Sequence, residues 1–201
     1  MKDNVIIESN SFTDLDYFIG NIDKLIKEVY FYNDLYCDDS NVIAMNKISP
    51  TAFNIFQEAL HNKIITSIVS YLYDSDQHGR GDKAKENLSL RNVFCSYSEL
   101  IDNELSCLRN DIIEIKSQMN IEKYRNSLVS HADKRIMTRQ IEEPKHGIET
   151  ELVLDLLTKS RSFLIKLRFK DAKIKNRKSF PNGGQNTIRY NYADELLRKL
   201  K

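Results

Sequence analysis

Apolar side chains recur every three or four residues along most of the chain, which is the pattern of amphipathic α-helices. The first two stripes cover residues 15–36 and 53–72. Ser49 and Pro50 precede the second stripe and supply an N-cap followed by proline at the first helical position. We therefore expect two long helices here, followed by a polar loop over residues 74–82.

The same pattern continues through the second half of the chain. Pro144 and Gly147 interrupt it and predict a loop, and the Pro-Asn-Gly-Gly sequence at 181–184 excludes helix. The helices expected here are, in order, a short one beginning near 86–90, a longer one over 101–119, its continuation over 121–131, a further main helix over 152–167 and a short terminal helix near 193–200.

Long amphipathic helices joined by short connections favour antiparallel neighbours. The predicted fold class is therefore all-α, an up-and-down helical bundle of about five main helices with no sheet. The chain has 201 residues, the size of one domain or of one domain with an appended piece. We divide it into a single bundle domain over 1–170 and a basic C-terminal extension over 171–201 that contains the short terminal helix.

Basic charge is concentrated near the C-terminus. The formal net charge is only +1, yet residues 161–189 carry nine Lys or Arg and a single acid, Asp171. A polyanion is one partner for such a stretch, and a solvated helix face is the alternative. If the partner is RNA, the residues expected to hold its backbone are Lys170, Lys173, Lys175, Arg177, Lys178 and Arg189.

Other features exclude several classes of protein. The chain has no secretory signal and no apolar run near the roughly 20 residues that span a bilayer, so we expect a cytoplasmic protein without a membrane partner. Its three cysteines form no C-x-x-C pair, which predicts free, buried thiols. Its four histidines lack metal-ligand spacing, so we expect no metal and no other cofactor.

One segment carries residues suited to cleaving a phosphodiester without a metal: Arg125, Asn126 and His131. Arg125 is permanently charged, so its guanidinium would stabilise the charge that grows on the phosphoryl oxygens. His131 titrates near neutrality, so it can move protons as general acid or base, and Asn126 would position either partner. A reaction that uses the ribose 2′-hydroxyl as nucleophile would act on RNA and leave DNA intact.

Helix geometry restricts this interpretation. On a straight α-helix, Arg125 and His131 lie about 120° apart around the axis and about 9 Å along it. They reach one phosphate only if the helix breaks near Ser130 or if a second copy of the chain completes the site across a two-fold axis. The second case predicts a homodimer. Arg139 and His146 have a similar spacing, but they fall in the expected loop.

At these residues the sequence resembles the higher eukaryotes and prokaryotes nucleotide-binding (HEPN) superfamily, whose hallmark is Arg, a polar residue, a short spacer and His. Glu86-Asn87-Leu88-Ser89-Leu90, Tyr124-Arg125-Asn126 and His131-Ala132-Asp133 are similar to the AbiU-type abortive-infection branch. The likeness runs from about Ser49 to Leu167.

The resemblance implies a dimeric helical bundle that cleaves RNA without metal, in toxin or antiphage defence. It implies RNA as substrate, a second copy as partner and, for a toxin, an antitoxin protein. Arg125, Asn126 and His131 would take the family's site positions. The superfamily also holds members that bind without cutting, so a noncatalytic module for nucleotide, RNA or protein is the alternative function. In a third reading, the segment from Tyr124 to His131 only packs an interface, and His131 continues an apolar stripe as a core residue.

Overall fold

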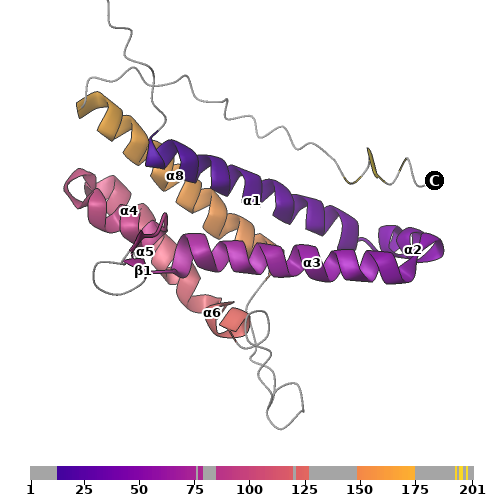
Figure 1. Cartoon of the computed structure of the whole chain (residues 1–201). Helices are drawn as coiled ribbons and strands as arrows, with labels where there is room; N and C mark the ends of the chain where they lie inside the picture. Colours follow the sequence, from indigo (N-terminus) through magenta and orange to yellow (C-terminus); the bar gives the residue numbers. More distant parts are fainter. Residues whose placement is uncertain are drawn as a thin grey trace, which may run out of the picture.

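The computed structural model describes residues 13–75, 77–78, 85–119, 121–126 and 149–174, together with 193, 195, 196 and 198. Its elements, in chain order, are α1 (Asp14–Tyr36), α2 (Asp39–Ile48), α3 (Pro50–Ile68), the π-helical turn η1 (Val69–Tyr73), β1 (Gln77–His78), β2 (Lys85–Glu86), α4 (Leu90–Ser96), the 3-10 turn η3 (Ser98–Leu100), α5 (Asn103–Gln118), α6 (Ile121–Tyr124) and α8 (Thr150–Ile174). The predicted all-α helical bundle is confirmed (Figure 1).

Polar side chains fix where several helices begin. Thr13 and Asp16 form a reciprocal capping box at the start of α1, in which the Thr13 backbone N–H donates to the Asp16 carboxylate over 2.9 Å. Ser89 accepts a hydrogen bond at the start of α4, and Asp102 does so at the start of α5. Each cap satisfies a backbone N–H that has no partner within its own helix.

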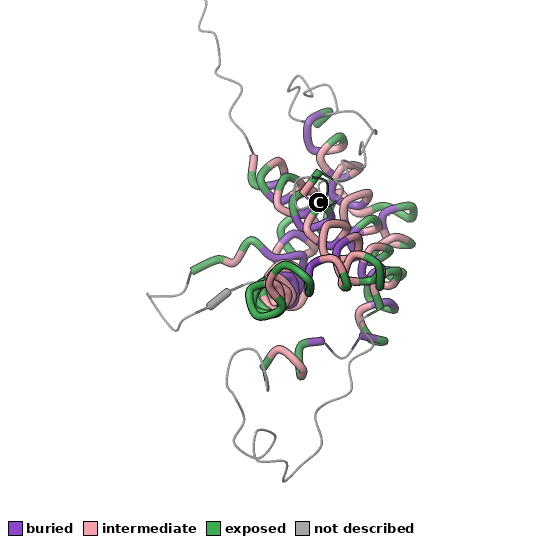
Figure 2. Tube along the Cα trace, turned by 90° about the vertical axis from the view of Figure 1, so that its right-hand side faces the viewer, coloured by how far each residue is buried: buried purple, intermediate pink, exposed green. Residues whose placement is uncertain are grey.

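The main core lies where α1, α3, α5 and α8 meet. The largest buried side chains include Phe18 of α1 and Phe163 of α8, both fully enclosed. Figure 2 shows the buried positions along the inward faces of the helices. The long helix α8 makes its most extensive contacts with α1 and α5, and it holds them together. The stripes predicted for α1, α5 and α8 therefore do form the core.

Two expectations about the first half of the chain need correction. The helix α2 was not predicted, and the polar residues after Tyr36 contain its cap, because the Asp38 carboxylate accepts from the Ser40 N–H over 2.8 Å. The stripe predicted for α3 is buried only in its second half, and Phe56 remains 41% exposed. The first half of α3 extends past the main core, where a small second cluster contains Leu35, Met45 and Ala193.

Smaller differences concern the loop, the cysteines and the C-terminal segment. The polar loop after η1 contains a short antiparallel ladder between β1 and β2. The cysteines are free, but they are exposed rather than buried: Cys37 is the residue that caps the end of α1, and Cys95 and Cys107 lie outside the buried faces of α4 and α5. The helix α8 continues past residue 170 to Ile174, and the four described residues of the terminal segment, 193, 195, 196 and 198, are helical. No helix in the described ranges is both long and apolar enough to cross a membrane.

Candidate functional site

The short helix α6 carries the first two residues of the predicted site at its end. Ile121 is fully buried and anchors α6 in the main core. The ring of Tyr124 meets His61 of α3 edge-on, with 6.3 Å between ring centroids, and His61 in turn lies 5.9 Å from Tyr32 of α1. This row of rings ties the end of α6 to α3 and α1, so the residue that follows, Arg125, starts from a fixed position.

Arg125 and Asn126 contact one another directly after the end of α6. The Arg125 guanidinium donates from Nη1 to Asn126 Oδ1 over 2.7 Å. The Arg125 Nε is buried and has no hydrogen-bond partner among the described residues. Asn126 is exposed and lines a hollow beside α6. Part of the guanidinium is thus enclosed by protein while the neighbouring amide faces solvent.

His131 lies outside the described residues, as do Ser130 and the second pair, Arg139 and His146. Whether Arg125 and His131 converge therefore stays a prediction. The backbone at 125–126 is already π-helical, with hydrogen bonds that reach one residue farther than in an α-helix.

Sequence reasoning missed a contact between Tyr73 and Lys116, which lies against the start of α6. The Tyr73 hydroxyl donates to the Lys116 backbone carbonyl over 3.0 Å. The Lys116 ammonium donates to the Leu72 carbonyl and lies 4.5 Å from the centroid of the Tyr73 ring. Both carbonyls belong to the last turns of helices, so each side chain caps the C-terminal end of the other's helix. We call this pair the Tyr73–Lys116 clasp.

Burial changes the acid–base properties of the clasp. Burial lowers the pKa of the Lys116 ammonium, and the charge of Glu122 opposes this only in part. Burial also raises the pKa of Tyr73, and Glu122 raises it further. The negative charge of Glu122 thus acts on both groups of the clasp.

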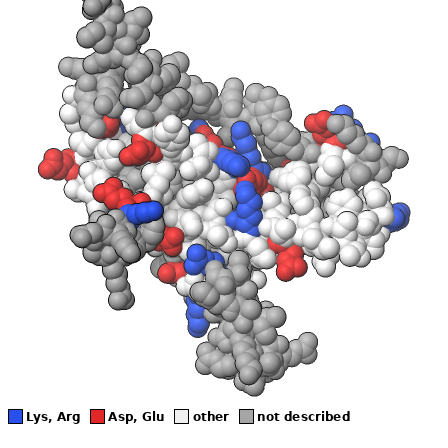
Figure 3. All heavy atoms as spheres, in the orientation of Figure 1, with Lys and Arg blue, Asp and Glu red and all other residues white. Residues whose placement is uncertain are grey.

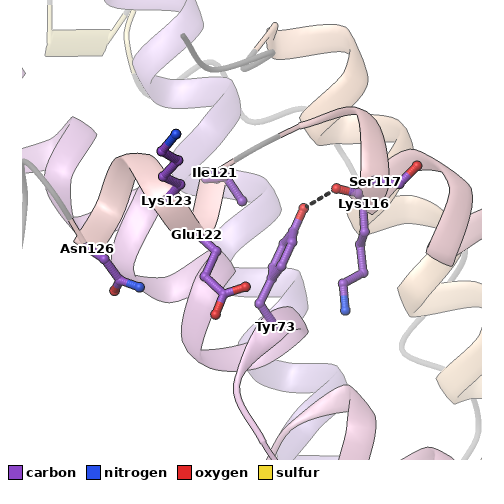
Figure 4. A pocket seen from close by; sticks show the side chains of 7 residues that line it. All are labelled: Tyr73, Lys116, Ser117, Ile121, Glu122, Lys123 and Asn126. Carbon is purple, nitrogen blue, oxygen red and sulfur yellow. Dashed lines mark hydrogen bonds between the residues drawn. The ribbon is translucent and has the colours of Figure 1, made fainter. Parts of the chain in front are cut away.

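The clasp and α6 together line a hollow of about 470 Å³ that is open to solvent. That volume lies within the range of small-molecule binding sites. Figure 4 shows the Tyr73 ring in the middle, with Lys116 on one side and Glu122 on the other, and with Asn126 beyond Glu122. The lining residues are Tyr73, Lys116, Ser117, Ile121, Glu122, Lys123 and Asn126.

In the described part of the basic stretch, residues 161–174, most of the positive charge is paired with acids. Within the described part of α8, four of its cations pair with acids of α1 or α5 or with the cap of α5: Arg161 with Asp23, Lys166 with Glu104, Arg168 with Asp16 and Lys170 with Asp102. Lys and Arg side chains likewise lie beside Asp and Glu on the face seen in Figure 3.

The residues proposed to hold RNA therefore differ from one another. Lys170, which was expected to contact RNA, is bound to Asp102, whereas Lys173 is exposed. Lys175, Arg177, Lys178 and Arg189 lie outside the described residues. Across the described ranges, no three His, Cys, Asp or Glu side chains gather in a way that could hold a metal ion.

Comparison of the chain with known proteins found no matching family model, no matching curated protein and no matching solved structure. Its function is therefore inferred from the chemistry of its own residues.

Proposed function

We propose that the protein is a metal-independent endoribonuclease of the HEPN type, acting as a homodimer in toxin or antiphage defence. The observation that carries the proposal is the pairing of Arg125 with Asn126 beside a polar hollow. A guanidinium that is partly enclosed by protein is less exposed to solvent screening, so it acts more strongly on a nearby phosphate. Its forked donors match the oxygens of a phosphate.

In the proposed reaction, His131 removes the proton of the ribose 2′-hydroxyl, and the 2′-oxygen attacks the adjacent phosphorus. The bond to the 5′-oxygen breaks, and that oxygen takes up a proton from an imidazolium as it leaves. Arg125 stabilises the charge on the nonbridging oxygens, and Asn126 orients the guanidinium through the hydrogen bond between them. The products are a 2′,3′-cyclic phosphate and a 5′-hydroxyl.

The test is cleavage of a labelled single-stranded RNA by the purified protein in EDTA, with the matching DNA as control. We expect the RNA alone to be cut, and Arg125→Ala and His131→Ala each to lower the rate by about 100-fold or more. Arg139→Ala and His146→Ala are matched controls with the same residue types, and they should retain the parent rate. If Arg125→Ala and His131→Ala cut as fast as the parent, the assigned roles are wrong.

One observation favours the alternative function, in which the protein is a noncatalytic module that binds a nucleotide, RNA or a partner protein. Arg125 already donates to Asn126, and the hollow beside them has the volume of a ligand site. This alternative predicts saturable, salt-sensitive binding of RNA without turnover. An EDTA-resistant activity that disappears with His131→Ala would eliminate it.

A further inference from the structure

We infer that the hollow between η1, the end of α5 and α6 is a nucleobase subsite that selects guanine beside the linkage to be cut. The inference rests on the proposed function, because it takes RNA as the ligand. It adds a base preference and assigns it to Glu122, a residue outside the Arg-Asn-His pattern. Binding of single nucleotides tests it independently of cleavage.

The lining of the hollow suits a nucleotide better than an apolar ligand. It offers one aromatic ring, one carboxylate, one amide and two amines, and Ile121 is the only aliphatic side chain among its lining residues. Unpaired bases are recognised by stacking on aromatic rings and by hydrogen bonds to their edges. Each of these contacts has a donor, an acceptor or a ring available in this hollow.

Tyr73 is held ready for stacking. Its hydroxyl is fixed to the Lys116 carbonyl, and the Lys116 ammonium covers one side of its ring at 4.5 Å from the centroid. The side of the ring that faces Glu122 borders the hollow (Figure 4). A base entering the hollow therefore meets a ring whose orientation is already set, and it loses little freedom in adjusting to it.

Glu122 determines which base fits. A carboxylate only accepts hydrogen bonds, and its two oxygens match two adjacent donors. Guanine presents such a pair on its pairing edge, the ring N1–H and the N2 amino group, whereas uracil, cytosine and adenine do not present two adjacent donors there. Glu122 is exposed and extends toward the hollow, so it can reach that edge (Figure 4).

Two neighbours of Glu122 place the nucleotide relative to the site. Asn126 lies beyond Glu122 in the same hollow and accepts a hydrogen bond from Arg125, so the hollow adjoins the side chain that holds the guanidinium. The Lys123 side chain points away from Glu122 in Figure 4, so its ammonium is available to a phosphate at the rim of the hollow rather than to the base.

Equilibrium binding of the four nucleoside monophosphates to the full chain tests the inference. We expect guanosine monophosphate to bind at least tenfold more tightly than the other three. Glu122→Gln should remove this preference, because an amide both donates and accepts: it no longer matches two adjacent donors and instead fits adenine or cytosine, whose pairing edges present a donor beside an acceptor. Glu114→Gln, an exposed carboxylate of α5 outside the hollow, is the matched control and should keep the preference of the parent.

Two further variants separate binding from folding. Tyr73→Phe keeps the ring and removes the hydroxyl of the clasp, so it should retain guanine binding, whereas Tyr73→Leu should lose it by tenfold or more. Circular dichroism of each variant verifies that the helices form. Equal binding of all four nucleotides by the parent, or an unchanged guanine preference in Glu122→Gln, would overturn the subsite.

Failure of the subsite and failure of the nuclease are distinguishable. Guanine-selective binding that depends on Glu122, without any cleavage of RNA, would support the subsite and refute the proposed nuclease. Cleavage that depends on His131 but shows no base preference in either the parent or Glu122→Gln would refute the subsite and leave the nuclease standing.

Discussion

The Arg125 side chain has a buried Nε without a hydrogen-bond partner among the described residues, and its Nη1 bonds the exposed Asn126 next to it. Arg125→Ala removes a weakly satisfied polar group, so the free energy of unfolding should change by no more than about 1 kcal/mol. Urea denaturation measures this. A loss well above that value would favour the reading in which the segment only packs an interface.

A second arginine supplies the control for that measurement. Arg168 pairs with Asp16 over 2.8 Å, and both side chains are largely buried, at 11% and 16% exposed. Arg168→Ala leaves a buried carboxylate without its cation, so it should lower the free energy of unfolding by about 3 kcal/mol.

The same pair predicts how stability depends on pH. Burial by itself raises the pKa of Asp16, but hydrogen bonds from Arg168 and Thr13 outweigh it and hold the pKa below its ordinary 3.8. The folded state therefore binds this proton less tightly than the unfolded state does. The resulting stabilisation is complete above the unfolded-state pKa and is lost as the pH falls through the folded-state pKa.

In Asp16→Asn, the free energy of unfolding should therefore depend less on pH in the acid range than it does in the parent. Denaturation of the parent and of the variant at pH 6, 4 and 3 would measure it. Asp155→Asn, which alters an exposed pair with Lys159, is expected to have little effect on this pH dependence. If Asp16→Asn and the parent showed the same pH dependence, the Asp16 carboxylate would not be the group that stabilises the fold in this way.

At the scale of elements, α8 is held between its neighbours by ion pairs to α1, to α5 and to the cap of α5. Charges that are neutralised within the fold release few counterions when RNA binds. Lys170→Gln should therefore leave the salt dependence of RNA binding unchanged, because Lys170 pairs with Asp102. Lys173→Gln should lower the slope of log K against log salt by about 0.7, the contribution of one phosphate of a single strand.

Fluorescence anisotropy with a labelled RNA over a range of salt concentrations would measure both slopes. An equal decrease for Lys170→Gln and Lys173→Gln would mean that the pair with Asp102 opens when RNA binds. No decrease for Lys173→Gln would exclude this part of α8 from the RNA interface.

Helices with a long apolar stripe or a clear cap could be predicted from sequence, and α2, which lacks such a stripe, was missed. The helices α1, α5 and α8 bury the positions that their periodicity indicates. The helix α2 buries only Met45, so it offers no stripe to detect. The hydrogen bond between Arg125 and Asn126 joins neighbours in the chain, whereas the Tyr73–Lys116 clasp joins residues 43 positions apart that follow no motif. Lys116 in the last turn of α5 was the one available signal, as a cation suited to a helix C-terminus.

At the scale of the whole molecule, the proposed site requires Arg125 and His131 to reach one phosphate, although a straight helix would hold them apart. A two-fold dimer resolves this if Arg125 of one chain acts with His131 of the other. Two variants that are each inactive would then complement one another. A mixed dimer of Arg125→Ala and His131→Ala chains contains one intact site and one site that lacks both residues.

Refolding an equal mixture of Arg125→Ala and His131→Ala chains, and measuring the cleavage of single-stranded RNA in EDTA, therefore tests the central claim most directly. Half of the dimers would be mixed, and each would have one working site of two, so the mixture should recover about a quarter of the parent rate while each variant alone stays inactive. Full activity in either variant alone would contradict the claim that this arginine and this histidine cleave RNA.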